Sequence, residues 1–315
     1  MLQLDPSSRV VLTGPSGWIG TAMLNAIADQ LGGCLNGRVT AFASSARMLD
    51  MGWGEQLEVR PLSTITPADV AGAHVVHLAY LTKEKAELLG QAAFDATNEA
   101  IDEALHRAIE AAAPASLFVA SSGAASLAER GEDDHPYGRA KLRQEERFLS
   151  WARLSGVPTI AGRIYNLAGP YINKVRSYAI SDFAMQAQET GEIRISAAVP
   201  VFRSYLHVSD LCALVLGAAR MGLARQSPID LSGAEAVEMA DIAHLVAQTW
   251  PAPPPIRREP VNFARPSLYL GDPTHARILA MELDETLRPL VAQVADTIEW
   301  LRQGALPRQG SATND

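Results

Sequence analysis

The chain has 315 residues, and 48% of them are hydrophobic, which is enough to bury a sizeable core in one large domain or two interlocked ones. Its 35 acidic and 27 basic side chains give a formal net charge of −8 without any dense Lys/Arg run, so neither a nucleic-acid partner nor an anionic membrane is expected. Two cysteines, no signal-peptide pattern and no run of 18 apolar residues predict a cytoplasmic protein without a disulfide framework, a zinc site or a membrane span.

Short β-branched runs alternate with longer helical patterns over the first two hundred residues. Strands are predicted at 9–14, 38–44, 73–80, 116–122 and 158–166, and helices at 18–31, 91–112 and 137–155. Beyond residue 166 Pro and Gly become frequent, and two further helices are expected at 208–222 and 288–303. This alternation predicts an α/β fold with a doubly wound parallel sheet covered on both faces.

The first predicted strand runs directly into TGPSGWIG, which places Gly14, Gly17 and Gly20 at the turn into the first helix. A tight turn there needs positive φ, a diphosphate needs an approach without a Cβ, and helix-on-strand packing needs a small residue. The N-terminus of the following helix offers free N–H groups and a positive dipole end to phosphates. The context therefore predicts dinucleotide binding, with a plain structural turn as the alternative.

The second predicted strand, RVTAFASSAR, has no acidic residue near its end, and the next one is Asp50. A site that prefers NAD normally ends this strand with Asp or Glu, which accepts hydrogen bonds from the adenosine 2′-hydroxyl. Here Ser44, Ser45 and Arg47 offer hydroxyls and a guanidinium to a 2′-phosphate. The sequence therefore favours NADP(H), with Arg47 as the main discriminator. NAD(H) stays possible if these are ordinary loop residues.

Tyr137 and Lys141 stand four residues apart in HPYGRAK, where a helix is expected to begin. One helical turn places both side chains on the same face. A buried or half-buried ammonium beside a phenol stabilises the phenolate and lowers its pKa from about 10 toward neutrality, which makes Tyr137 a usable acid or base. The alternative is a packing tyrosine beside a surface lysine, and the motif alone does not decide between them.

Seven segments occur in the order typical of the extended short-chain dehydrogenase/reductases: TGPSGWIG, VVHLAY, ATNEA, VASSGAA, YGRAK, RIYNLAGP and RSYLHVSDL. Over residues 9–303 the chain resembles, more narrowly, the NAD(P)-dependent epimerase/dehydratase family that acts on nucleotide sugars. The resemblance implies a Rossmann domain from 1–166 and 205–230, and a smaller substrate-binding region from 167–204 and 231–315. It also implies a homodimer formed through helices 91–112 and 137–155, which carry exposed-looking apolar positions.

The resemblance gives each catalytic position a role. Tyr137 is implied as the catalytic acid/base, and Lys141 as the group that binds the nicotinamide ribose and lowers the tyrosine pKa. Ser122 would hydrogen-bond the substrate oxygen, with Ser121 as its close competitor, and Asn98 would stabilise the cofactor site. The remaining cofactor contacts are implied for the glycine loop and the end of the third strand: Gly14, Ser16, Gly17, Trp18, Ile19, Gly20, Leu78, Ala79 and Tyr80.

Two further signatures point to the substrate. Asn166 in RIYNLAGP is implied to contact the phosphates of a sugar nucleotide, and Arg203 in FRSYLHVSDL to approach its diphosphate. Arginine suits that role because its rigid fork donates two hydrogen bonds to phosphate oxygens. Asp210 is expected to cap the following helix or to join a structural network. His77 and His207 are expected to be structural.

The residues after Ser122, GAASLAERGEDDHP, lack the acidic side chain that dehydratases place directly after the serine, so dehydration is disfavoured. The resemblance implies hydride transfer at a sugar carbon of a nucleotide-activated hexose, and the sequence leaves epimerisation and net reduction of a 4-keto sugar both open. A reductase of a non-sugar ketone is one alternative, against which Arg203 and Asn166 argue. A cofactor-binding sensor without turnover is another, against which the intact Ser–Tyr–Lys set argues. No metal ligand set is predicted.

Overall fold

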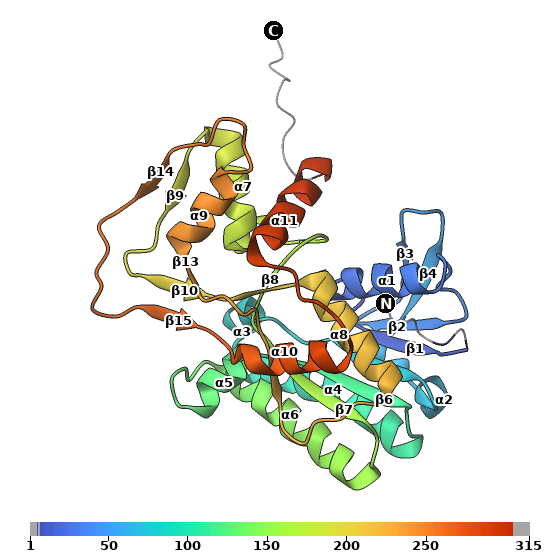
Figure 1. Cartoon of the computed structure of the whole chain (residues 1–315). Helices are drawn as coiled ribbons and strands as arrows, with labels where there is room; N and C mark the ends of the chain where they lie inside the picture. The colour runs from blue at the N-terminus through green and yellow to red at the C-terminus, as the bar shows by residue number, and fades with distance from the viewer. Residues whose placement is uncertain (1–4, 6, 305–315) are drawn as a thin grey trace.

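The apolar β-branched runs form the main sheet in the computed structural model of the chain, which describes residue 5 and residues 7–304 (Figure 1). The sheet has eight strands in the spatial order β12-β7-β6-β5-β1-β2-β4-β3. The strands are β1 (Val10–Thr13), β2 (Val39–Ala43), β3 (Arg47–Asp50), β4 (Gln56–Pro61), β5 (His74–His77), β6 (Ser116–Ser122), β7 (Thr159–Ile164) and β12 (Ile229–Leu231). All neighbours pair in parallel except β3, which runs antiparallel to β4 at one edge.

The strand order reverses between β1 and β5. From β1 the chain passes to β2 on one side and later returns to place β5 on the other side of β1. Open α/β sheets bind ligands outside the carboxyl ends of the strands at such a reversal. The prediction of an α/β fold with a doubly wound, Rossmann-type sheet is confirmed.

Because successive side chains of a strand point to opposite faces of the sheet, the strands contribute to two separate hydrophobic cores. Val10 and Leu12 of β1 pack into one core with α1 (Trp18–Gln30) and α8 (Val208–Met221), whereas Val11 packs into the other with α4 (Gln91–Ala111) and α6 (Pro136–Ser155). Strands buried on both faces need continuous apolar runs, which is why β1 and β6 are recognisable in the sequence. The shorter helices are α2 (Pro67–Val70), α3 (Lys83–Leu89) and α5 (Gly123–Glu129), with a 3₁₀ turn, η1 (Leu62–Thr64).

Most of the segments after β7 build a smaller part that Figure 1 shows above the main sheet, whereas α8 and β12 belong to the main sheet and its cover. Its short strands pair as β8 (Asn166–Ala168) with β11 (Tyr205–His207), as β9 (Ile193–Ile195) with β14 (Ile256–Arg258), and as β10 (Val201–Arg203) between β13 (Val237–Glu238) and β15 (Ser267–Tyr269). The helical elements of this part are η2 (Val175–Ser177), α7 (Ala179–Thr190), α9 (Met239–Ala247) and α11 (Leu290–Gly304), whereas α10 (Pro273–Glu282) packs against β12 and α8 beside the main sheet. Among the described residues, no helix is both long and apolar enough to cross a membrane.

Several predicted boundaries differ from the structure. The strand expected at 73–80 ends at His77, and the one expected at 158–166 breaks at Tyr165 into β7 and β8. The edge strand β3 and the helices α7, α9 and α10 were not predicted. Most of β3 is exposed, so it carries no apolar run that would mark it. Arg47 therefore opens a strand instead of lying in a loop. The predicted region 231–315 ends with residues outside the described part of the chain.

The outer faces of α4 and α6 are charged, so the expected apolar positions on these helices were wrong. Arg143 of α6 pairs with Asp95 of α4 at 2.6 Å, and Arg147 pairs with Glu103 at 2.9 Å. Within the described part of the two helices, Leu154 is the only large apolar side chain that is exposed. Large apolar residues of the two helices, such as Leu105 and Phe148, are buried in the core against the sheet.

Candidate active site

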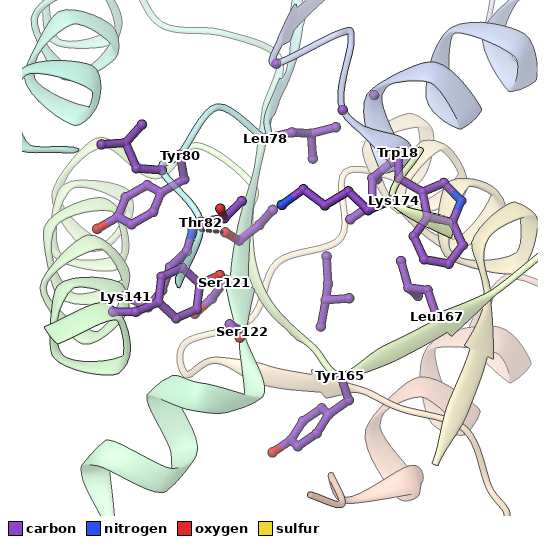
Figure 2. Close-up of a pocket in the computed structure, with 18 of the residues that line it drawn as sticks. Trp18, Leu78, Tyr80, Thr82, Ser121, Ser122, Lys141, Tyr165, Leu167 and Lys174 are labelled. Carbon is purple, nitrogen blue, oxygen red and sulfur yellow. Dashed lines mark hydrogen bonds between the residues drawn. The ribbon is translucent and has the colours of Figure 1, made fainter. Parts of the chain in front are cut away.

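A cavity of about 320 Å³ opens at the carboxyl ends of β1, β5 and β6 (Figure 2). Figure 2 shows Tyr80 and Lys141 on one side of it, and Trp18, Lys174 and Leu167 on the other. The predicted site residues that line the cavity are Gly14, Gly17, Trp18, Ile19, Gly20, Leu78, Tyr80, Ser122, Tyr137 and Lys141. The predicted residues outside its lining are Ser16, Ser44, Ser45, Arg47, Ala79, Asn98, Asn166 and Arg203.

The three glycines of the loop after β1 serve different purposes. Gly14 has a φ of +73°, and a Cβ there would lie 3.0 Å from the backbone nitrogen of Ala79. A Cβ on Gly20 would lie 2.1 Å from the carbonyl oxygen of Gly14, so the loop and the helix pack backbone to backbone. At Gly17 the nearest atom would be 3.6 Å away, which is an ordinary contact. Gly17 is also the N-cap of α1 and provides no side-chain cap, so the first N–H groups of the helix are available to an anion.

The loop after β5 is fixed by two polar side chains. The hydroxyl of Thr13 accepts hydrogen bonds from the backbone N–H groups of Leu78 and Ala79, both at 3.0 Å. Asn98 of α4 is buried, and its Oδ1 accepts from the N–H of Leu81 at 2.9 Å. Asn98 thus holds the loop that lines the cavity.

Arg47 reaches back from β3 to the glycine loop. Its Nη2 donates to the hydroxyl of Ser16 at 2.6 Å, and both side chains are exposed. Ser44 and Ser45 follow the end of β2 and are also exposed. The structure therefore places a cation beside the start of α1, and the exposed Ser44 and Ser45 precede this arginine by three and two residues.

The two neighbouring serines at the end of β6 have different partners. The hydroxyl of Ser121 donates to Glu145, whose carboxylate is paired with Arg163 at 2.7 Å. Ser122 caps α5 by accepting from the N–H of Ala124 at 3.2 Å, and its oxygen lies 3.2 Å from the Tyr269 hydroxyl. The hydroxyl of Ser121 is therefore committed to a buried ion pair, whereas that of Ser122 faces the tyrosines of the cavity.

Tyr137 lies in the first turn of α6, where His135 caps the helix by accepting from the Tyr137 N–H at 3.1 Å. Its ring is 6.3 Å from the ring of Tyr80 and 6.5 Å from that of Phe94. Burial raises the pKa of the Tyr137 phenol above its ordinary value, and a hydrogen bond with Ser122 opposes this effect. The phenol is therefore neutral at physiological pH.

Lys141 is only 3% exposed. Its Nζ donates to the carbonyl oxygen of Ala120 at 2.7 Å and to the Oε1 of Gln144 at 2.8 Å, and it lies 3.6 Å from the centre of the Tyr80 ring. Burial lowers the pKa of Lys141 to about 7, while Asp102 and Glu145 act in the opposite direction. The expected lowering of the Tyr137 pKa by Lys141 is not found, because burial of the phenol dominates.

The two predicted substrate residues lie beside the cavity rather than in its wall. Arg203 of β10 donates to the backbone oxygens of Phe202 at 2.8 Å and Ser267 at 3.1 Å, and its guanidinium carbon is 5.9 Å from the Tyr269 ring. Burial lowers the pKa of Arg203, and none of the described carboxylates pairs with it. Asn166 donates to the carbonyl oxygen of Ser204 at 3.2 Å.

Among the lining residues that were not predicted are four with polar side chains that could meet a ligand, namely Tyr165, Lys174, Tyr178 and Tyr269. They follow β7 or lie in β15, and no motif or period in the sequence marks them. Tyr178 packs edge-on against Trp18, with ring centres 4.9 Å apart. It also lines a neighbouring hollow of about 260 Å³ whose wall includes Arg176 and Arg194.

His77 and His207 are buried, as expected of structural residues. His207, not Asp210, caps α8, because its ring nitrogen accepts from the Ser209 N–H at 3.2 Å. Asp210 instead accepts from the backbone N–H of Arg288 at 2.7 Å, so it belongs to the structural network that was its other predicted role.

Comparisons with known proteins agree on one group. Residues 10–230 match the model of the NAD dependent epimerase/dehydratase family. A curated relative, the dTDP-L-rhamnose 4-epimerase of Burkholderia thailandensis, is 27% identical over 156 residues, which are 49% of this chain and 40% of that protein. The chain thus spans about two fifths of that relative's length.

Solved structures resemble the whole chain. The UDP-glucose 4-epimerase of Thermotoga maritima, with UDP-glucose, has a TM-score of 0.73 at 18% identity over 94% of this chain and 99% of that chain. MoeE5 in complex with UDP-glucose and NAD has a TM-score of 0.69 at 22% identity, again over 94% of this chain and 99% of that chain. These likenesses show the fold.

Proposed function

The chain belongs to the NAD dependent epimerase/dehydratase family, and on this premise we propose that it transfers hydride between a nicotinamide cofactor and a sugar carbon of a nucleotide sugar. One observation carries the proposal. Ser122, Tyr137 and Lys141 lie in the same cavity as the glycine loop, so a cofactor diphosphate and the acid/base groups would share one site.

The residues present fit a nicotinamide dinucleotide. The uncapped N–H groups after Gly17 would hold the diphosphate, and the missing Cβ at Gly17 leaves room for its approach. Lys141 would bind the hydroxyls of the nicotinamide ribose. When bound, the cofactor supplies the hydride acceptor or donor, whereas the protein supplies orientation and proton transfer.

Tyr137 would exchange the proton of the sugar hydroxyl, and Ser122 would hydrogen-bond the same oxygen. The raised pKa of the phenol suits an acid that protonates an oxygen on which negative charge develops. Two hydroxyl donors aimed at one oxygen stabilise that charge, because the surrounding site is largely buried. In the reverse direction Tyr137 would accept the proton as a phenolate, a form that its burial disfavours.

The charge on Arg203 supports a diphosphate substrate. A half-buried guanidinium without a carboxylate partner among the described residues is costly unless an anion completes the site. Tyr178 lines both the main cavity and the hollow that contains Arg176 and Arg194, so the two spaces adjoin. We assign the main cavity to nicotinamide and sugar, and the adjoining hollow to the nucleotide of the substrate.

The contact of Arg47 with Ser16 supports a preference for NADP(H), since this cation lies beside the glycine loop. A 2′-phosphate there would gain a charge-assisted hydrogen bond from the guanidinium. NAD(H) would bind the same loop without that contact.

Among the possible outcomes, dehydration has the least support. Gly123 stands directly after Ser122, and a Cβ there would lie 2.4 Å from the ring of Tyr165, so no acidic side chain fits. The match to a 4-epimerase favours epimerisation, in which the ketone is reduced again from its other face. In net reduction of a 4-keto sugar, fresh reduced cofactor would enter each cycle.

A thermal-shift screen against nucleotide sugars, with each cofactor present, tests this proposal, because a specific ligand stabilises the folded protein by mass action. Nucleotide sugars that stabilise the protein are then incubated with it in the presence of catalytic or stoichiometric amounts of cofactor, and the products are identified by NMR. An epimer formed with catalytic cofactor supports epimerisation, and a reduced sugar formed with stoichiometric cofactor supports reduction. Turnover of non-sugar ketones alone, or cofactor binding without any turnover, would contradict the proposal.

We also propose a homodimer formed through α4 and α6. The ion pairs Arg143–Asp95 and Arg147–Glu103 would form the rim of the helix bundle. Sedimentation of the wild type and an Arg147→Glu variant would test this. A variant that dimerises as well as the wild type would mean that the interface does not involve α4 and α6.

The free thiols of Cys34 and Cys212 support a cytoplasmic location.

A further inference from the structure

A line of hydrogen-bonded side chains connects Lys141 with the strand ends beneath the glycine loop. The Nζ of Lys141 donates to the Oε1 of Gln144 at 2.8 Å, and the Nε2 of Gln144 donates to the Oδ1 of Asp102 at 2.6 Å. The Nε2 of His77 lies 3.2 Å from the same Asp102 oxygen. The Nδ1 of His77 lies 2.8 Å from the hydroxyl of Thr13. This series of hydrogen bonds therefore connects α6 through α4 with β5 and β1.

The direction of each hydrogen bond follows from its neighbours. The hydroxyl oxygen of Thr13 already accepts from two backbone N–H groups, so its proton goes to the Nδ1 of His77. His77 must then carry its own proton on Nε2 and donate to Asp102. Gln144 donates to Asp102 as well, which turns its carbonyl oxygen to Lys141. Asp102 therefore accepts hydrogen bonds from both sides, from Gln144 and from His77.

All members of this line are buried. The exposed fractions are 0% for Thr13, 1% for His77, 4% for Asp102, 1% for Gln144 and 3% for Lys141. A buried carboxylate is costly without a compensating positive charge, and so is a buried ammonium without a negative one. Asp102 and Lys141 are one glutamine side chain apart, which allows each charge to offset the other.

We propose that Asp102 is a positioning residue for Lys141: through Gln144 it keeps the ammonium charged and aimed, and through His77 it ties that charge to the strands that carry the glycine loop. The consequence for catalysis rests on the proposed function, because it assumes that a charged Lys141 binds the cofactor ribose. The electrostatic link itself does not depend on any substrate.

The other groups around Lys141 do not replace Asp102. Glu145, one turn further along α6, is bound to Arg163 by two hydrogen bonds of 2.9 and 2.7 Å, so its charge is already compensated. Tyr80 presents the face of its ring, and Tyr137 is neutral because burial raises its pKa. Asp102 is the strongest of the groups that hold the pKa of Lys141 up against burial.

The chain contains four lysines, namely Lys83, Lys85, Lys141 and Lys174, and three of them are exposed. NMR of protein labelled with ¹³C,¹⁵N-lysine therefore follows the titration of Lys141 directly, without substrate or turnover. Asp102→Asn should move the titration midpoint of Lys141 to lower pH by about one pH unit, since an opposite charge nearby is lost. His77→Gln, which leaves the carboxylate in place, should leave the midpoint nearly unchanged.

Gln144→Met provides a second variant if Asp102→Asn fails to fold, and it should also lower the midpoint because the link is broken. In turnover assays of an active enzyme, Asp102→Asn should shift the alkaline limb of the pH profile in the same direction. At pH values below that limb, the turnover rate of the variant should stay close to that of the wild type. An unmoved Lys141 midpoint in a folded Asp102→Asn or Gln144→Met variant overturns the proposal, as does an equal shift in His77→Gln. If no nucleotide sugar is turned over, the proposed function fails while the NMR result still stands.

Discussion

The glycine-loop wall of the cavity consists mainly of backbone, whereas the facing wall consists of side chains from distant segments. Gly14 and Gly20 bring backbone into contact with backbone, and the N–H groups of α1 face the cavity. Elsewhere in the lining, Tyr178 and Tyr269 come from segments about ninety residues apart, and the guanidinium carbon of Arg203 lies 5.9 Å from the centre of the Tyr269 ring. Backbone recognition suits a ligand common to many enzymes, since it needs only a loop of fixed shape. Side-chain recognition suits a particular substrate, because single residues can change without loss of the loop.

The largest expected effect lies at Tyr137, which lines the cavity together with both groups of residues. Tyr137→Phe should lower turnover by about 10²–10⁴-fold, because only the proton-transfer group is lost while the ring remains. Cofactor affinity should stay nearly unchanged. Steady-state kinetics and a cofactor titration measure both. Tyr171→Phe is the control, since this tyrosine lies outside the cavity lining and its turnover should match the wild type. A Tyr137→Phe enzyme with wild-type turnover would remove this residue from the mechanism.

The side-chain wall is tested at Arg203, which lies outside the lining but next to Tyr269. Arg203→Ala should weaken binding of nucleotide sugar by about 2–5 kcal/mol, the range for losing one partner of a buried charge pair. Binding of the dinucleotide should change little, because its diphosphate belongs to the glycine loop. Isothermal titration of each ligand measures the difference, and Arg203→Lys should restore part of it. Equal losses for both ligands would mean that Arg203 supports the fold and that the two walls are not separate.

The backbone wall is tested by a matched pair of glycines. Gly20→Ala should lower the free energy of unfolding by about 1–3 kcal/mol, because its Cβ would collide with backbone that cannot move aside. Gly17→Ala meets no close atom and should leave thermal stability unchanged. It should still weaken dinucleotide binding, since Gly17 lines the cavity. Equal melting temperatures for the two variants would contradict the claim that the loop and α1 pack backbone to backbone at Gly20.

Burial of Lys141 gives a pH dependence to stability. Its pKa is lowered from 10.5 to about 7 in the folded protein, so the unfolded chain binds more protons between these values. Stability contributed by this group therefore rises with pH across that window, by roughly 1 kcal/mol per pH unit. Lys141→Met should remove this slope when urea unfolding is compared from pH 7 to 10. An identical slope in wild type and variant would mean that Lys141 is not the group that titrates.

The sequence predicts the two walls unequally, and the reason is physical. β6 was predicted at its observed bounds, and α4 and α6 to within one residue, because long buried elements carry continuous or periodic apolar patterns. Tyr269 was missed because β15 has three residues and no pattern of its own. Arg203 was predicted as a substrate residue only through a motif. The link from Lys141 to Asp102 joins two helices, so no local spacing reveals it.

The smallest expected effect concerns Arg47, where a side chain adds specificity to the backbone wall. Arg47→Ala should weaken NADP(H) binding by about tenfold, as loss of one exposed charge-assisted hydrogen bond implies, and leave NAD(H) binding unchanged. Because Arg47 is exposed, the difference should shrink as salt is raised. Side-by-side fluorescence titrations of both cofactors at low and high salt measure it. Ala43→Asp should act in the opposite sense, since a carboxylate at the end of β2 repels a 2′-phosphate and accepts from a 2′-hydroxyl. Equal binding of both cofactors by the wild type, or an Arg47→Ala variant that keeps its NADP(H) affinity, would contradict the role of Arg47 as the discriminator.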